Sequence, residues 1–77
     1  MTSADKKQLA MDKIVEFCFL RESLGHKKIK RDACQAVAES HVGQIVFTND
    51  DFQEIATKVG AQYKVSPFGK SRAFIVF

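Results

Sequence analysis

The stretch FTNDDFQEIATKVG, residues 47–60, contains the clearest secondary-structure signal in the chain. Thr48 is a helix N-cap residue, and Asp51 follows at the third helical position, where its carboxylate can bond back to the cap. Phe47 and Phe52 lie on either side of the cap at the spacing of a hydrophobic staple. The pattern therefore predicts a helix that begins after Thr48. Its apolar stripe consists of Phe52, Ile55, Ala56 and Val59.

Two further helices and a short strand are expected before this stretch. Apolar residues recur at helical spacing over residues 4–24, and a second helical pattern covers residues 28–40. Residues 44–47 follow a glycine and are rich in β-branched and aromatic side chains, which is typical of a strand.

A β-hairpin is expected after the stretch. Its strands are predicted at residues 62–66 and 72–77, and its turn at residues 67–70, where a proline and a glycine interrupt the pattern. In the last strand, Phe74 and Val76 point to one face and the remaining apolar side chains to the other, so both faces are apolar.

The terminal strand has no charge or proline to protect its edge after Arg72. Two arrangements satisfy such a strand. It lies in the centre of the sheet beside residues 44–47, or its edge is covered by another protein or by a second copy of the chain. The sequence therefore permits a homodimer through this strand.

Together these elements predict one α+β domain over residues 1–77, with three helices, a short strand and a C-terminal β-hairpin in the order α-α-β-α-β-β. The arrangement resembles the winged-helix architecture over most of the chain, on topology and without a specific motif. In that family a short strand lies between the first and second helices, and a helix-turn-helix pair follows. Here the strand is expected between the second and third helices.

The composition is that of an ordinary globular domain, with 45% hydrophobic and 27% charged residues. The longest apolar run, residues 73–77, is too short to cross a membrane, and the first residues lack the apolar segment of a signal peptide. Cys18 and Cys34 occur in apolar helical patterns and are interpreted as buried free thiols in a reducing compartment. The expected location is the cytoplasm, with no membrane partner.

A basic cluster stands at the expected start of the second helix. Cations at a helix N-terminus oppose the macrodipole, whereas the third helix begins with the acids Asp50 and Asp51. This contrast predicts that the cluster binds an anion such as phosphate, and an acidic protein or plain solvent is the alternative. The cluster consists of His26, Lys27, Lys28, Lys30 and Arg31, and the phosphate contacts are expected from Lys27, Lys28, Lys30 and Arg31.

The hairpin contributes a second basic patch made of Lys64, Lys70 and Arg72. These side chains are expected to lie along a phosphate backbone, in keeping with the net charge of +3. Tyr63 and Phe68 are candidates for stacking on the bases of a single strand.

The third helix is a poor candidate for reading a DNA groove. Asp50, Asp51 and Glu54 would repel phosphates, so the second helix and the hairpin are expected to make the nucleic-acid contacts. The same acidic helix is instead suited to contact a protein.

Metal binding and catalysis are not expected. Cys18, His26, Cys34 and His41 match no zinc-binding spacing, and the chain has no glycine-rich phosphate loop or nucleophile elbow. No cofactor is therefore predicted, and the chain is not expected to be an enzyme.

The function predicted from the sequence is a small nucleic-acid-binding or transcription-regulatory module, with DNA as the expected nucleic acid. The alternative is a protein-interaction module, a small inhibitor or adaptor of a larger machine. Such a module would use the acidic third helix or the apolar C-terminal strand.

Overall fold

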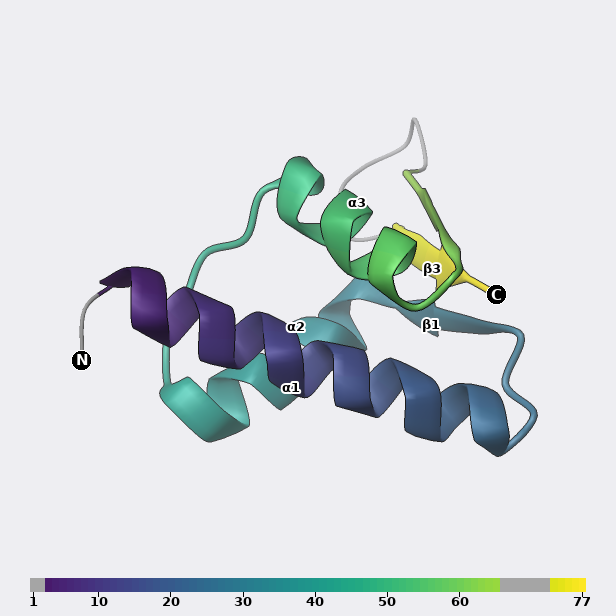
Figure 1. Cartoon of the computed structure of the whole chain (residues 1–77), viewed down its shortest axis with the longest axis horizontal. Helices are drawn as coiled ribbons and strands as arrows, with labels where there is room; N and C mark the ends of the chain where they lie inside the picture. Colours follow the sequence, from purple (N-terminus) through teal and green to yellow (C-terminus); the bar gives the residue numbers. More distant parts are fainter. Residues whose placement is uncertain (1–2, 66–72) are drawn as a thin grey trace.

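The computed structural model describes residues 3–65 and 73–77, which form three helices and one antiparallel sheet of three strands (Figure 1). This confirms the predicted α+β fold with a C-terminal pair of strands. In chain order the elements are α1 (Ser3–Ser23), β1 (Lys28–Lys30), α2 (Arg31–Val42), α3 (Asn49–Lys58), β2 (Gln62–Lys64) and β3 (Phe74–Val76).

The terminal strand β3 lies in the centre of the sheet, which has the strand order β1-β3-β2. Ile75 is paired with Ile29 on one side and with Tyr63 on the other, both antiparallel. Of the two arrangements left open by the sequence, the central position is the one found, although the neighbours of β3 are not residues 44–47. Within the described chain β3 is paired on both sides, so it has no open edge with which a second copy of the chain could pair.

The predicted order α-α-β-α-β-β is wrong at one strand, because the short strand lies between the first and second helices. Residues 28–30 form β1, and α2 begins only at Arg31. Lys30 has extended backbone angles (φ −67°, ψ 142°) and makes no side-chain cap. Ile29 fits a helical stripe and an alternating strand equally well, and its pairing with Ile75 decides in favour of the strand.

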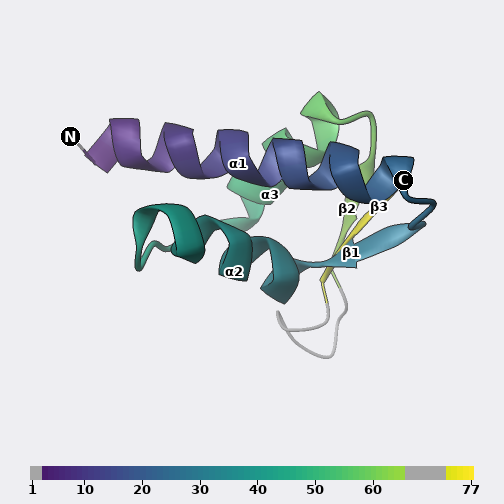
Figure 2. The same ribbon diagram turned by 90° about the horizontal axis from the view of Figure 1, so that it is seen from below.

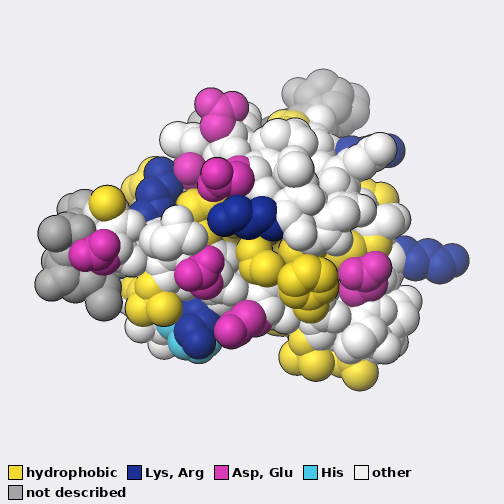
Figure 3. Space-filling view, in the orientation of Figure 1, with side chains coloured by type: hydrophobic (Ala, Val, Ile, Leu, Met, Phe, Trp, Pro, Cys, Tyr) yellow, Lys and Arg dark blue, Asp and Glu magenta, His cyan; other side chains and the backbone are white. Residues whose placement is uncertain are grey.

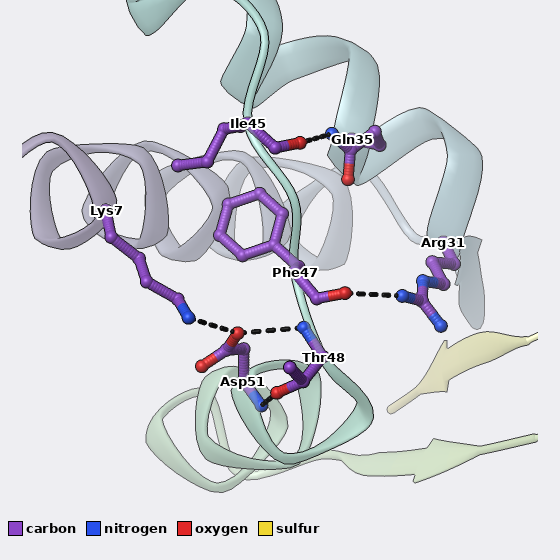
Figure 4. Close-up of polar contacts among 7 residues, drawn as sticks. All are labelled: Lys7, Arg31, Gln35, Ile45, Phe47, Thr48 and Asp51. Carbon is purple, nitrogen blue, oxygen red and sulfur yellow. Dashed lines mark hydrogen bonds and ion pairs between the residues drawn. The ribbon is translucent and has the colours of Figure 1, made fainter. Parts of the chain in front are cut away.

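Residues 44–47 do not form the predicted strand. Side chains of the helices, rather than a neighbouring strand, bind the carbonyl groups of this segment (Figure 4). Lys6 donates to the Gln44 carbonyl (2.8 Å) and Gln35 to the Ile45 carbonyl (2.6 Å). Arg31 donates to the Phe47 carbonyl at 2.9 Å. With these acceptors satisfied, the segment needs no sheet partner.

The start of α3 confirms the capping box. The Asp51 backbone N–H donates to the Thr48 hydroxyl (3.2 Å), and the Thr48 N–H donates to the Asp51 carboxylate (2.8 Å). The Phe47 and Phe52 rings pack edge to face with their centroids 5.4 Å apart. Lys7 of α1 pairs with the same carboxylate at 2.7 Å, so an ion pair joins α1 to this cap (Figure 4).

Asp51→Asn is expected to lower the free energy of unfolding at neutral pH by about 1 kcal/mol. Partial burial raises the pKa of the Asp51 carboxyl, but the bonds from Lys7 and Thr48 outweigh it and hold the pKa below its ordinary value. A depressed pKa in the folded state stabilises the fold above the pKa of the unfolded chain, and this contribution is lost as the pH falls through the folded pKa. Urea unfolding of both proteins at several pH values measures the difference, which should shrink in acid. A difference independent of pH would show that the charge has no role.

The core lies between the three helices and the inner face of the sheet. Figure 2 shows α1 and α2 side by side, with the sheet beyond the start of α2. The largest fully buried side chains are Phe52, Ile14, Ile55, Ile75, Cys18 and Cys34.

Cys18 and Cys34 are free thiols in this core, which confirms their predicted burial. The hydrogen bond with Cys18 and burial both raise the pKa of the Cys34 thiol. A protonated buried thiol is a poor nucleophile and a poor metal ligand, so Cys34 serves packing. The hydrogen bond with Cys34 lowers the pKa of the Cys18 thiol and burial raises it, and Cys18 is fully buried beside its partner.

Candidate nucleic-acid interface

The sheet brings together lysines that are far apart in the sequence. Lys28 and Lys30 lie on β1 and Lys64 on β2, and all three are exposed. Lys30 and Lys64 are paired with Phe74 from opposite sides, which places their backbones about 10 Å apart, twice the usual strand spacing. We call the face that bears them the outer sheet face. It consists of Lys28, Lys30, Gln62, Lys64, Phe74 and Val76.

The outer sheet face combines an apolar centre with cationic edges. Phe74 and Val76 are half-buried on the central strand, and the Lys28 ammonium lies 4.7 Å from the centroid of the Phe74 ring. These six residues include no acid. A face of this kind attracts phosphate and offers an apolar surface next to it.

A shallow cleft of about 180 Å³ extends the positive charge beside β1. Every ionisable side chain that lines it is basic, namely Arg21, His26, Lys28 and Lys30. Arg21 lies over the Phe17 ring (4.9 Å to the centroid) and within 3.4 Å of the His26 ring nitrogen Nε2. The end of α1 thus adds one cation, Arg21, to the residues that were predicted to contact phosphate.

The lysines of the basic cluster do not lie in α2, so they do not oppose its macrodipole as the sequence predicted. Lys28 and Lys30 precede α2 on an extended strand, and the first turn of α2 contains Asp32, as helix stability favours. Lysines on edge strands also prevent unwanted strand pairing. The positive charge itself remains, and Lys27 lies exposed in the turn before β1.

Arg31 faces the interior of the domain. Its Nη1 donates to the Asn49 side chain (2.9 Å) and to the Tyr63 hydroxyl (3.0 Å), and its Nη2 donates to the Phe47 carbonyl (2.9 Å). The guanidinium also lies over the Phe52 ring, 4.6 Å from the centroid. These contacts give Arg31 a structural role that its position in a basic cluster did not indicate.

The remaining candidates of the hairpin divide into two groups. Lys70, Arg72 and Phe68 lie outside the described residues. Tyr63 lies on the inner side of the sheet, where its ring stacks on Phe52 at 5.5 Å and its hydroxyl donates to Asn49 at 3.0 Å. The structure therefore does not present Tyr63 on the same face as Lys30 and Lys64.

The face formed by α1 and α3 has a different character. Figure 3 shows acidic side chains spread over both helices and hydrophobic side chains over the C-terminal half of α1. Asp50 and Glu54 are exposed on α3, as are Leu20 (56%) on α1 and Leu24 (66%) in the turn that follows α1. A groove of about 330 Å³ between α1 and α2 is lined by Lys13, Glu16, Phe17, Leu20, Val37, Ser40 and His41.

Within residues 3–65 and 73–77, no group of three or more His, Cys, Asp or Glu side chains is placed to hold a metal ion. No helix in this part of the chain has both the length and the apolar character needed to span a bilayer. No protein-family model, curated protein or solved structure matches the chain.

Proposed function

We propose that the protein binds nucleic acid, with the phosphate backbone held by the outer sheet face and the adjoining turn. The observation on which this depends is the convergence of Lys28, Lys30 and Lys64 on one face that has no acid among its residues. Lys27 and the cations of the cleft beside β1 extend the same surface. Several ammonium groups on one face provide the sequence-independent part of nucleic-acid affinity.

The order of elements supports a winged-helix-like module. With β1 between α1 and α2, and α2 followed by α3, the chain has the element order of the winged-helix architecture that it resembles in topology. The segment between β2 and β3, residues 66–72, occupies the place of a wing in the sequence and contains Lys70 and Arg72. On this likeness we propose a role in transcription regulation on DNA.

The helix α3 is unsuited to enter a groove of DNA. Asp50 and Glu54 are exposed on it, and the Asp51 carboxylate is already held by the cap and by Lys7. We therefore assign the nucleic-acid contacts to the sheet and the wing, and Arg31 is left out of the surface because its donors face inward.

The double variant Lys30→Glu/Lys64→Glu is expected to bind a fluorescently labelled oligonucleotide at least tenfold more weakly than the unchanged protein. Its plot of log affinity against log salt should be shallower by about 1.5–2, because two phosphate contacts are lost. Fluorescence anisotropy over a range of salt concentrations measures both quantities.

The matched control is Lys13→Glu/Lys58→Glu, which changes the net charge equally at two helical positions outside the sheet. It should reduce the affinity much less. Equal losses in the two double variants would show that only the net charge matters, and the proposed interface would be rejected.

A protein partner is the alternative, favoured by the exposed acids of α3 and the exposed Leu20 and Leu24. Binding through the apolar Leu20 and Leu24 would depend only weakly on salt, whereas phosphate binding falls steeply with salt. Binding through either of these surfaces would not be weakened by Lys30→Glu/Lys64→Glu. In either case we propose a cytoplasmic location, since Cys18 and Cys34 are free thiols. We also propose that the protein has no enzymatic activity and no cofactor.

A further inference from the structure

The outer sheet face has an aromatic ring, that of Phe74, on its central strand. Phe74 lies opposite the core side of β3, because its neighbour Ile75 is fully buried. The ring is half-buried and lies between Lys30 of β1 and Lys64 of β2, which are paired with Phe74 from either side. Val76 lies on the same face of the central strand.

We propose that this face binds single-stranded nucleic acid by stacking an unpaired base on Phe74, while Lys30 and Lys64 bind phosphates on either side. The inference rests on the proposed function and adds to it the strand form of the nucleic acid. In a duplex the base faces are covered by their neighbours, so only an unpaired base can lie flat on the ring.

The register places the parts of such a site in one row. Lys30, Phe74 and Lys64 are directly paired across the three strands. Strand spacing puts each lysine backbone about 5 Å from that of Phe74, so a base on the ring has a cation at both edges. Aromatic rings between cationic side chains are the usual means of binding single strands without sequence preference.

The contact between Lys28 and Phe74 is compatible with this use of the ring. An exposed ammonium over a phenyl ring, here at 4.7 Å, is a weaker contact than a stacked base. A base can therefore replace it, and the released ammonium of Lys28 then pairs with phosphate.

A single strand fits this face better than a protein does. Phe74 and Val76 are the two apolar members of the outer sheet face, whereas a stable protein interface buries roughly 800 Å² on each partner. The lysines around them favour an anionic partner, and a base attached to phosphates combines the flat apolar surface with the negative charge.

Phe74→Trp provides a direct test, because the chain contains no tryptophan of its own. Titration with an oligothymidylate of about ten nucleotides should quench the fluorescence of the new indole as bases stack on it. A duplex of the same length should leave the emission unchanged. Circular dichroism of the variant checks that the fold is retained.

Val46→Trp is the matched control. Val46 is 81% exposed and lies in the connection between α2 and α3 (Figure 1), which is not part of the sheet. Its indole should not respond to the oligothymidylate, although labelled oligonucleotide binds both variants equally.

Phe74→Leu gives a second measurement that does not depend on fluorescence of the protein. Leucine keeps the apolar cover but removes the ring, so the affinity for oligothymidylate should fall about tenfold. The slope of affinity against salt should not change, because the phosphate contacts remain.

Salt-dependent binding without quenching of the Phe74→Trp indole, or without a loss of affinity in Phe74→Leu, would overturn the stacking site and leave the proposed function standing. Equal affinity for duplex and single strand would overturn it as well. If the unchanged protein binds neither form, the proposed function and this inference fail together.

Discussion

Phe52→Ala is expected to lower the free energy of unfolding by about 3–5 kcal/mol, a large part of the total stability of a domain of this size. The Phe52 side chain is fully buried. Its ring contacts Phe47 (5.4 Å between centroids), Tyr63 (5.5 Å) and the Arg31 guanidinium (4.6 Å). Alanine would leave a cavity where α3, the 44–47 segment and the sheet meet, and these elements cannot all close over it.

Urea unfolding followed by circular dichroism measures the loss. Phe19→Ala is the control, because Phe19 is 51% exposed on α1 and its truncation should cost no more than about 1 kcal/mol. If the two variants unfold at similar urea concentrations, Phe52 is not the central core residue described here.

Arg31→Met is expected to lower the free energy of unfolding by about 2–3 kcal/mol. The substitution keeps an unbranched side chain of similar length but removes three donated hydrogen bonds. Their acceptors are the Asn49 side chain, the Tyr63 hydroxyl and the Phe47 carbonyl. One side chain thus joins the start of α2 to the 44–47 segment, α3 and β2.

Lys30→Met is the matched control at the preceding residue, where the side chain is exposed and the expected change in stability is within about 0.5 kcal/mol. For oligonucleotide affinity we expect the opposite ranking of the two variants. Arg31→Met should keep its affinity for oligonucleotides under conditions where it is folded, whereas Lys30→Met should lose affinity. If Arg31→Met lost affinity and Lys30→Met kept it, Arg31 would belong to the phosphate-binding residues after all.

The third helix could be predicted because its determinants are local. Thr48, Asp51, Phe47 and Phe52 lie within six consecutive residues, and the bonds they make are those of any capped helix. The short strand could not be placed in the same way. Whether residues 28–30 begin a helix or form a strand depends on β3 at the other end of the chain.

The candidate site was predictable as a set of residues but not as a surface. The sequence shows that Lys28, Lys30 and Lys64 are basic, and only the register shows that they share a face with Phe74. Arg31 belongs to the same basic run, yet its donors turn inward, because the direction of a side chain depends on the acceptors that tertiary contacts supply.

The way in which residues 44–47 are held changes which positions can vary. The bonds from Lys6, Gln35 and Arg31 all end on backbone carbonyls, and every amino acid has one. Gln44, Ile45 and Val46 are therefore free to change in identity without loss of these bonds. For these bonds, the requirement for a particular side chain moves to positions 6, 31 and 35. The orientation of α3 is therefore encoded in α1 and α2 as well as in the Phe47 ring that packs on Phe52.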